Sequence, residues 1–372
     1  MTNISILTSK RIYMRYYLFT FITIIAFVGC DGKNHNHMIS AKVPGAHHCY
    51  PVDIDGDGDI DILSAAYDAG KFFLHENTGN GRFADRLLAD GWKKATCISA
   101  LDFDGDGDYD ILASAKDANA VILFENVNGK FHEKIVSNTA TYAYKVTAND
   151  FDDDGKTDIA YARFTQEKTL YLLLQENNGF TEVAIGEEKS STSDLDLADI
   201  DRNGEMDIVA AAAASGKIWW FRNLGNRNFQ DHLLLSGLSV PFSVKCGDID
   251  NDGDIDVAVS TYDDGSILWL EQRRNGKFES HMIDQTGAQT PSLVLADFDK
   301  DGDIDIAAAL KSFNSIYWYE NDGKGHFHYH IVSRNTEGVF NIQAADIDHD
   351  SYPEIIAASY EAGTVTWHDV VK

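Results

Sequence analysis

The stretch Asp53-Ile54-Asp55-Gly56-Asp57-Gly58-Asp59-Ile60-Asp61 contains five carboxylates in nine residues. Carboxylates that close together repel one another unless a cation lies among them, so the stretch predicts a metal site. It recurs along the chain, with its first Asp at positions 53, 102, 150, 199, 248, 297 and 346. The step is 49 residues, with a single step of 48. A period this constant predicts a repeat architecture rather than two ordinary domains.

Each repeat reads as four short strands. Around the fourth loop we expect strands at Leu195–Ala198, Ile208–Ala213, Lys217–Asn223 and Asn228–Leu235. No stretch shows sustained helical periodicity, and runs of β-branched or aromatic residues are bounded by Gly, Asn and Asp. Seven repeats of four strands predict an all-β, seven-bladed β-propeller with four-stranded blades. A solenoid would need atypical capping repeats at both ends, and the sequence offers none.

The two ends of the repeat array complement each other. The last repeat finishes with a strand near Thr364–Asp369 and therefore lacks its fourth strand. The N-terminal segment His35-Asn36-His37-Met38-Ile39-Ser40 matches the fourth-strand segment His328-Tyr329-His330-Ile331-Val332-Ser333. We therefore expect the N-terminal strand to complete the last blade and to remove the open sheet edges.

The first thirty residues look like an export signal. Basic residues precede an apolar run of twelve residues from Leu18 to Gly29, which is too short to span a bilayer as a helix. The run ends in Phe27-Val28-Gly29-Cys30, which resembles the lipobox of bacterial lipoproteins, although Leu is commoner than Phe at the position of Phe27. This resemblance implies a signal peptide at 1–29, lipidation of Cys30, and an outer-membrane or cell-surface location. The seven repeats then predict a propeller at 30–372.

The net charge of −28 is largely explained by the loops, since 33 of the 59 acidic residues lie in them. Seven divalent cations would cancel 14 of these charges, so the acidity is better interpreted as ligand charge than as a recognition surface. No basic stripe is present that could replace the counterions of a nucleic acid. Apart from Cys30, the thiols are Cys49, Cys97 and Cys246, an odd number, and we expect no disulfide.

Two further residue types recur at fixed positions. Tryptophans occur 49 residues apart, and their mid-strand position favours packing between blades over a sugar platform; they are Trp220, Trp269, Trp318 and Trp367. Histidines also share one position, and a pairing or surface role is expected because they lie on different blades and cannot converge on one zinc ion; they are His37, His232, His281 and His330.

The loop chemistry favours calcium. Calcium takes six to eight oxygen ligands in flexible geometry, and Asp53, Asp55 and Asp57 alternate so that a turn can bring their side chains together. Gly58 permits a reversal at positive φ, the carbonyl of Asp59 can face the ion, and the carboxylate two residues later closes the shell. An EF-hand is excluded because its closing Glu stands at position 12 between helices. Magnesium prefers fewer protein ligands, and zinc prefers nitrogen or sulfur.

The same positions supply the expected ligands in every loop. The seventh position contributes its carbonyl, which makes Lys156 acceptable, and Asn203 contributes an amide oxygen. The expected set is Asp53, Asp55, Asp57, Asp59 and Asp61; Asp102, Asp104, Asp106, Asp108 and Asp110; Asp150, Asp152, Asp154, Lys156 and Asp158; Asp199, Asp201, Asn203, Glu205 and Asp207; Asp248, Asp250, Asp252, Asp254 and Asp256; Asp297, Asp299, Asp301, Asp303 and Asp305; and Asp346, Asp348, Asp350 and Glu354. Ser351 and Pro353 disturb the seventh loop, so we expect six good Ca²⁺ sites and a weak or empty seventh.

The D-x-D-x-D-G-x-x-D pattern on a propeller repeat resembles the FG-GAP/VCBS repeat family, which includes the calcium loops of integrin α-subunits. The resemblance covers the chain from residue 30 onward and implies a calcium-binding β-propeller. The chain lacks literal Phe-Gly and Gly-Ala-Pro segments, so integrin-type ligand recognition does not carry over. It looks closer to the bacterial secreted branch.

Function should depend on residues that break the repeat. Residues five and three before each loop should line the channel, and residues fourteen after each loop start should lie near the mouth opposite the calcium loops. From these positions the candidate ligand-binding residues are His48, Tyr50, Lys145, Asp194, Asp196, Lys245, Tyr67, Tyr262 and Tyr360.

Three functions are consistent with this set. The first is a cell-surface binding or adhesion propeller, expected to be monomeric, for a glycan or protein ligand. The second is a polysaccharide lyase in which Tyr50 or His48 acts as base and Lys145 or Lys245 neutralises a uronate. The third is an assembly scaffold. The sequence contains no nucleophile elbow, catalytic zinc motif or phosphate loop, and leans away from an enzyme.

Overall fold

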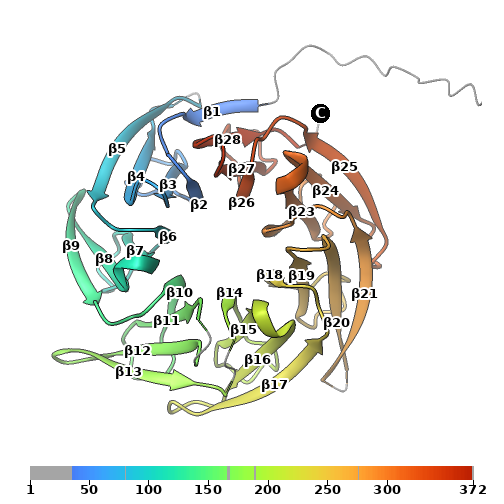
Figure 1. Ribbon diagram of the computed structural model, residues 1–372, viewed down its shortest axis with the longest axis horizontal. Coiled ribbons are helices and arrows are strands. Elements are labelled where there is room, and N and C mark those ends of the chain that lie inside the picture. The colour runs from blue at the N-terminus through green and yellow to red at the C-terminus, as the bar shows by residue number, and fades with distance from the viewer. Residues whose placement is uncertain (1–35, 80, 166–167, 188–189, 275, 371–372) are drawn as a thin grey trace, which may run out of the picture. The chain divides into compact units, whose positions relative to one another are not determined.

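The computed structural model describes residues 36–370, apart from 80, 166–167, 188–189 and 275. These residues form a ring of seven four-stranded antiparallel sheets, which confirms the predicted seven-bladed β-propeller (Figure 1). The interpretation of residues 1–29 and of Cys30 lies outside the described residues. Among the residues that are described, no helix has the length and hydropathy needed to cross a membrane.

The first strand of each blade lines the centre of the ring and the fourth lies at its rim (Figure 1). Blade 1 contains β2 (Ala46–Val52), β3 (Asp61–Ala66), β4 (Lys71–Asn77) and β5 (Phe83–Asp90). Blade 2 contains β6 (Ala95–Leu101), β7 (Asp110–Ala115), β8 (Ala120–Val127) and β9 (Lys130–Ser137). Blade 3 contains β10 (Ala143–Asn149), β11 (Asp158–Arg163), β12 (Leu170–Glu176) and β13 (Gly179–Ile185). Blade 4 contains β14 (Thr192–Ala198), β15 (Asp207–Ala212), β16 (Lys217–Asn223) and β17 (Phe229–Ser236).

The remaining blades follow the same order. Blade 5 contains β18 (Pro241–Gly247), β19 (Asp256–Thr261), β20 (Ser266–Arg273) and β21 (Lys277–Gln285). Blade 6 contains β22 (Ser292–Ala296), β23 (Asp305–Leu310), β24 (Ser315–Asn321) and β25 (Phe327–Ser333). Blade 7 contains β26 (Val339–Ala345), β27 (Glu354–Ser359) and β28 (Thr364–His368), and β1 (Asn36–Ser40) is its fourth strand.

The closure of the ring follows the prediction from the repeats. Strand β1 pairs antiparallel with β28, so that His37 lies opposite Trp367 and their rings stack at a centroid distance of 3.8 Å. The buried side chain of His368 lies 2.8 Å from Asn36 Oδ1 and 2.9 Å from Thr366 Oγ1. The first and last described strands therefore belong to one sheet, and both its hydrogen bonds and its side chains close the circle.

The core lies between the blades. Seven apolar clusters each join two neighbouring blades, including the pair formed by blades 7 and 1. Trp220, Trp269, Trp318 and Trp367 belong to four of these clusters and are buried, which confirms the prediction of packing between blades. Each of these indoles stacks or packs in a tilted geometry against the histidine opposite it on the fourth strand, with ring centroids 3.8–4.8 Å apart. The predicted pairing role of the histidines is confirmed.

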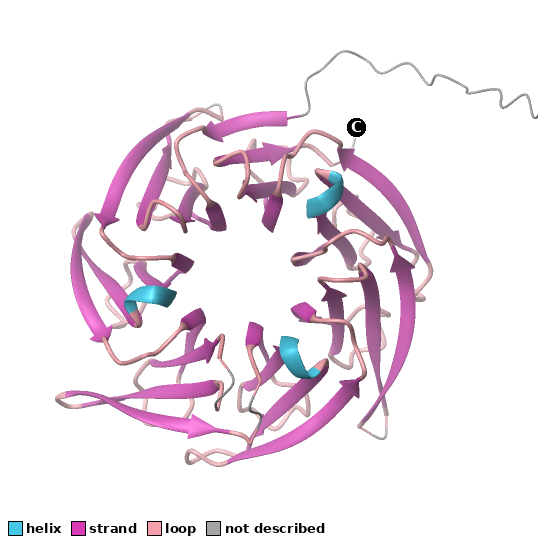
Figure 2. Cartoon of the chain, in the orientation of Figure 1, coloured by secondary structure: helices cyan, strands magenta, loops and turns pink. Residues whose placement is uncertain are grey.

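Two irregularities distinguish the blades. Short 3-10 helices, which the sequence did not predict, follow the second strand in blades 2, 4 and 6 at Lys116–Ala118, Ala213–Ser215 and Lys311–Phe313 (Figure 2). In blades 1 to 5 and in blade 7 the first strand contains a bulge, where pairing with the second strand skips one residue. A bulge turns two consecutive side chains toward the same side of a strand, and these bulges lie at the end of the channel away from the acidic loops.

Candidate functional site

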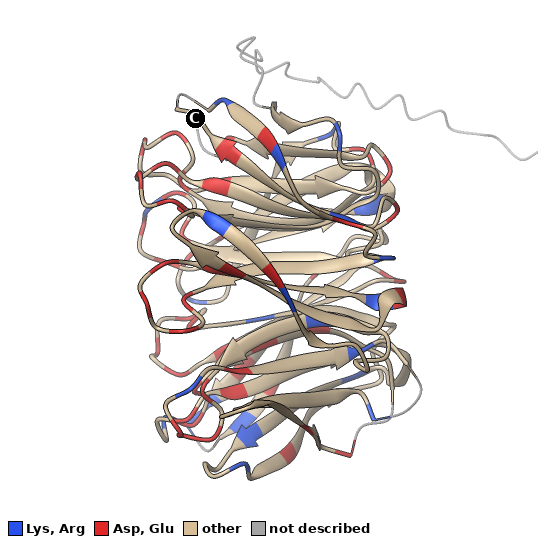
Figure 3. Ribbon diagram, turned by 90° about the vertical axis from the view of Figure 1, so that its left-hand side faces the viewer, with Lys and Arg blue, Asp and Glu red and all other residues tan. Residues whose placement is uncertain are grey.

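The acidic loops lie between the first and second strands of the blades and gather on one face of the ring, the loop face (Figure 3). In the first loop, Asp53 accepts hydrogen bonds from the backbone N–H groups of Gly56 at 2.9 Å and Gly58 at 3.0 Å. The second of these bonds recurs in all seven loops at 2.8–3.1 Å. The repeated sequence therefore produces one repeated turn, and Ser351 adopts it at φ 77° in place of glycine.

The closing acid of each loop is buried. One oxygen of Asp61 accepts the N–H of Ile54 at 3.3 Å and the other accepts the N–H of Asn77 at 2.7 Å. The other intact loops repeat this pair of bonds to the loop and to the third strand. Burial raises the pKa of Asp61 to about 6 and of Asp256 to about 7, because the charged form is poorly solvated there. A cation bound beside these carboxylates would stabilise their charged form and lower their pKa again.

Several acids at the first and third loop positions have a carboxylate oxygen that accepts no hydrogen bond. Buried carboxylate oxygens without a hydrogen-bond partner belong to Asp152, Asp201, Asp248, Asp297 and Asp346. In at least four loops, three carboxylates each offer an oxygen, and these oxygens lie within 4.8 Å of one another; the groups include Asp53, Asp55 and Asp57; Asp102, Asp104 and Asp106; Asp150, Asp152 and Asp158; and Asp199, Asp201 and Asp207. Unsatisfied buried carboxylate oxygens at this spacing fit a cation with oxygen ligands, as calcium requires.

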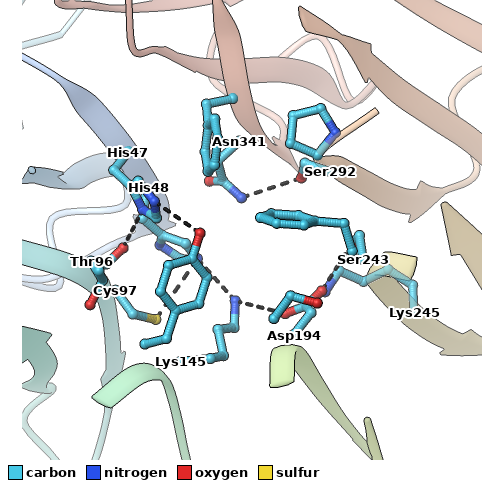
Figure 4. Close-up of a pocket in the computed structure, with 15 residues that line it drawn as sticks. His47, His48, Thr96, Cys97, Lys145, Asp194, Ser243, Lys245, Ser292 and Asn341 are labelled. Atoms are coloured by element: carbon cyan, nitrogen blue, oxygen red, sulfur yellow. Dashed lines mark hydrogen bonds and ion pairs between the residues drawn. The ribbon is translucent and has the colours of Figure 1, made fainter. Parts of the chain in front are cut away.

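A second set of residues fills the channel. In the six bulged blades, the residues six and five positions before the loop lie on the same side and both line the channel, and Pro291 and Ser292 occupy these two positions in blade 6. Around a small space of about 30 Å³ these positions bring together His47, His48, Thr96, Cys97, Tyr144, Lys145, Ser193, Asp194, Phe242, Ser243, Pro291, Ser292, Phe340 and Asn341 (Figure 4). This space holds no more than a few water molecules, so the channel is tightly packed at this level.

Charged groups in the channel pair with one another. The ammonium groups of Lys145 and Lys245 lie 3.3 and 3.2 Å from the carboxylate of Asp194 (Figure 4). Burial alone would raise the pKa of Asp194, but the two lysines lower it below its usual value. Burial likewise opposes the charge of Lys145, and Asp194 more than offsets this, so the pKa of Lys145 rises. The cluster is therefore ionised although it is buried.

His48 adjoins this cluster in its neutral form. Its Nε2 lies 3.0 Å from the Lys145 ammonium, which donates to it, and its buried Nδ1 has no hydrogen-bond partner. Burial and the positive charge of Lys145 hold the pKa of His48 well below its usual value. A chamber of about 310 Å³ follows, lined by His48, Tyr50, Cys97, Ser99, Ala100, Leu101, Lys145, Val146, Thr147, Ala148, Leu195, Asp196, Lys245 and Gln343. Leu101 directly precedes the second acidic loop, so the chamber extends toward the loop face.

The opposite end of the channel, the mouth, is surrounded by aromatic rings. Each odd-numbered blade contributes one ring from the position six before its loop and one from the position fourteen after its loop start. These eight rings, here called the collar, are His47 and Tyr67, Tyr144 and Phe164, Phe242 and Tyr262, and Phe340 and Tyr360. Contacts with centroid distances of 4.5–6.3 Å join all eight into one network.

The collar separates the predicted ligand-binding residues into two groups. The first group lies in the channel, between the loop face and the collar rings of the first strands; it consists of His48, Tyr50, Lys145, Asp194, Asp196 and Lys245. Tyr67, Tyr262 and Tyr360 lie in the collar, each close to a ring of its own blade. The sequence placed both groups at one mouth, and the bulged rings that divide them were not foreseen.

The comparisons with known proteins agree with the loop geometry. A family model described as FG-GAP-like repeat matches residues 53–113, 102–161, 150–210, 199–259, 248–308 and 297–357. The chain belongs to the FG-GAP-like repeat family. Among curated proteins, none matches this FG-GAP chain.

Solved structures share the FG-GAP propeller fold at low sequence identity. One, titled as the structural basis of specific recognition of non-reducing terminal N-acetylglucosamine by an Agrocybe aegerita lectin, is 18% identical with a TM-score of 0.57, over 79% of this chain and 82% of that chain. A mercury-soaked crystal of BBS1N in complex with ARL6DN gives 14% identity and a TM-score of 0.61, over 90% and 94%. The lead-soaked crystal of the same complex gives 13% identity and a TM-score of 0.58, over 91% of this chain and 98% of that chain. These similarities concern the fold alone.

Neighbouring FG-GAP loops also touch one another. The fourth residue of every loop has positive φ, and in several loops its side chain reaches the seventh residue of the next loop. Asn251 lies 2.5 Å from Asp303, and Arg202 lies 2.9 Å from Asp254. His349 lies 2.8 Å from Asp59, which carries the series across the closure from blade 7 to blade 1. The loop face is thus a chain of contacts as well as a set of separate turns.

Proposed function

We propose that this chain is an exported, calcium-stabilised FG-GAP propeller that binds a glycan or protein ligand through the collar at the channel mouth. The observation that carries the proposal is the collar itself, because its residues depart from the repeat that governs the loop face. Repeated positions maintain the ring, whereas the collar differs from blade to blade, and all of its aromatic rings except His47 are half-buried. Aromatic side chains give a binding site large apolar contact at little entropic cost.

Hydrogen-bonding groups flank the collar at blades 6, 7, 1 and 2. The Lys94 ammonium lies 4.3 Å from the ring centre of Tyr67 and 2.9 Å from a carboxylate oxygen of Asp68. Lys311 lies 3.2 Å from Glu361, beside Tyr360. Paired acids and lysines next to aromatic rings supply both donors and acceptors for a hydroxyl-rich ligand, and aromatic surface covers its apolar face.

The related folds have ligands of both classes. The Agrocybe aegerita structure is titled for recognition of N-acetylglucosamine, and the BBS1N structures for a complex with ARL6DN. A binding role for the present chain is consistent with both titles, and the collar favours the glycan.

A binding screen with a matched pair of variants tests the proposal. The calcium-loaded chain is applied to glycan arrays, and Tyr262→Ala is compared with Tyr109→Ala, which removes a tyrosine 45% exposed on the loop face. We expect the collar variant to lose binding and the loop-face variant to keep it. Equal loss in both variants, or equal retention, would contradict a ligand site in the collar. Silence of the wild-type chain toward glycans and proteins would instead support an assembly scaffold.

The proposal includes calcium as a structural ion. The six intact loops and, more weakly, the seventh would hold it through the carboxylates of the first, third, fifth and ninth positions. At dissociation constants of roughly 10⁻⁴–10⁻³ M, millimolar calcium stabilises the folded state by about 0.4–1.4 kcal/mol per site. Such ions would also neutralise part of the −28 net charge.

Export and lipidation complete the proposal. They rest on the sequence of residues 1–30, in which Cys30 would become the lipidated first residue at an outer-membrane or cell-surface location. Mass spectrometry of the protein purified from membranes tests this, since a Cys30→Ser variant should lose both the added lipid mass and the membrane fraction. An unmodified wild-type chain would contradict it.

A lyase is the second candidate, and the channel chamber favours it. His48 is neutral and lies next to Lys145, with Tyr50 in the same chamber. A neutral imidazole or a tyrosine can act as a base beside a lysine that neutralises a carboxylate. Turnover of uronate polymers to unsaturated products, lost in His48→Gln, would support the lyase over simple binding.

A further inference from the structure

In the described residues, basic side chains pair with an acid at the third or fifth position of two of the seven loops. In blade 4 the Arg222 guanidinium forms an ion pair with Asp201, the third residue of its loop. Arg222 directly precedes Asn223, whose N–H bonds the closing acid of the same loop. In blades 1, 2, 5 and 6 the residue at this place is an acid, namely Glu76, Glu125, Glu271 and Glu320. Blade 4 has therefore reversed the charge beside its loop.

The fourth loop is also poorer in free ligand oxygens. Its fifth residue is Asn203, whose side-chain N–H donates to the carbonyl of Asn223 at 2.9 Å. The amide oxygen of Asn203 accepts the N–H of Glu205 at 2.7 Å. Of the three carboxylates at ligand positions in this loop, Asp201 is paired with the Arg222 guanidinium, which stays charged at every pH relevant to the protein.

The third loop receives cations from two directions. Arg227, from the turn between β16 and β17 of the next blade, places Nε 2.6 Å from Asp152 Oδ2 and a terminal nitrogen 3.3 Å from Glu176. Within the loop itself, the ammonium of Lys156 forms an ion pair with Asp154. Two of the four side-chain ligands expected in this loop therefore already have a positive partner. The backbone carbonyl of Lys156 was the only part expected to matter, and its side chain acts as well.

The other intact loops differ in this respect. Among the ion pairs of the described residues, none involves the first, third, fifth or ninth acid of loops 1, 2, 5 or 6. Four carboxylates at ligand positions remain in each of these loops, and the nearby glutamates are paired with basic residues outside the loops, namely Arg86, Lys134, Arg273 and His330. Like charges at such spacing destabilise the turn until a cation arrives.

We infer that loops 3 and 4 are held together by cations from the chain itself and bind calcium more weakly than loops 1, 2, 5 and 6. The inference rests on the proposed role of calcium and specifies it loop by loop. In loops 3 and 4 an arginine or lysine already neutralises one or two of the expected ligands, so an entering calcium ion gains less there, or displaces the basic group, whereas in the other four loops it relieves repulsion. Blades 3 and 4 then form a sector that keeps its turns when calcium is scarce.

Calcium titration of the full chain tests the inference. Isothermal titration calorimetry should resolve four tighter sites, with the remaining sites at least about tenfold weaker, as expected for one displaced unit charge near the surface. Arg222→Glu, which restores the acid found in four other blades, should add one tighter site. Arg227→Gln should tighten a site in loop 3 by a smaller factor, because Lys156 remains. Lys130→Glu changes charge equally at an exposed rim position and should leave the stoichiometry unchanged.

Each result decides a separate question. Six sites of equal affinity, unaltered by Arg222→Glu, would overturn the inference and leave the calcium proposal intact. Absence of calcium binding in wild type and all variants would overturn both. Circular dichroism at each titration point confirms that the variants remain folded, so a missing site cannot be attributed to an unfolded protein.

Discussion

The two ends of the channel differ in how they use the repeat. At the loop face, seven copies of one sequence make seven copies of one turn, down to the hydrogen bond that the first Asp accepts at 2.8–3.1 Å. At the mouth, neighbouring blades carry different residues, with aromatic pairs on odd blades and a 3-10 turn on blades 2, 4 and 6. Positions repeated without change maintain the ring, and positions that vary are free to recognise a partner.

The largest expected effect is that of removing calcium, which should destabilise the loop face and not the mouth. If four loops bind calcium with millimolar-range constants, chelation lowers the free energy of unfolding by about 2–6 kcal/mol. Thermal melting with and without a chelator measures the loss, and magnesium at the same concentration serves as control. A midpoint that does not move would show that the loop face needs no ion.

Removing the closing acid of a loop should lower the free energy of unfolding more than removing an exposed acid of the same loop. Asp256→Ala leaves the N–H groups of Ile249 and Gln272 without their acceptor, and the expected loss is about 2–5 kcal/mol with or without calcium. Asp252→Ala removes an exposed ligand of the same site and should cost about 1 kcal/mol, only when calcium is present. Urea unfolding of both variants in calcium and in chelator gives the four values. Equal losses would mean that the closing acid acts only as a metal ligand.

The buried histidine of the collar should give the mouth a pH dependence. Burial lowers the pKa of His47 from 6.5 to about 4, so below pH 6.5 the unfolded chain takes up a proton that the folded chain refuses. Stability is therefore lost as pH falls, by about 2 kcal/mol between pH 6.5 and pH 5 from this group. His47→Gln should flatten that slope in calcium-loaded protein, while His328→Gln, at an exposed rim position, should not. A variant slope as steep as wild type would remove His47 from the account.

The smallest expected effect on stability is at Tyr262, one of the collar rings fourteen residues after a loop start. Tyr262 is only half-buried, so Tyr262→Ala should cost no more than about 1–2 kcal/mol while abolishing ligand binding. Chemical denaturation alongside the binding assay separates the two quantities. A large loss of stability would instead place Tyr262 among the residues that maintain the ring.

Much of this architecture could be predicted, because a constant step fixes both the number of blades and their strands. The Trp220 and Trp269 positions were correctly assigned to the core, since a residue repeated at one position in four consecutive blades meets equivalent neighbours in each. The rings of Tyr144 and Phe242 were missed because strict alternation along a strand turns them away from the channel, and only the bulge brings them in. A bulge depends on strand pairing, which no local pattern reveals.

The ion pairs inside the loops were missed for a different reason. Arg227 reaches its partner Asp152 from the next blade, 75 residues away in sequence, so loop spacing contains no sign of it. Arg222 left a local signal, since it stands at a position that is a glutamate in four other blades and an aspartate, Asp369, in blade 7. Comparing the repeats at every position, rather than at the loops alone, would have found it.

The alternation of blades has a consequence that depends on parity. An alternating pattern cannot close on a ring with an odd number of members, so two like blades must meet somewhere. Here blades 7 and 1 meet, which brings Tyr67 within 6.0 Å of Tyr360 and His47 within 4.5 Å of Phe340. Lys116 of blade 2 and Lys311 of blade 6 flank this junction on its two sides. The odd count therefore gives an otherwise symmetric mouth a single defined direction, from which an asymmetric ligand could take its orientation.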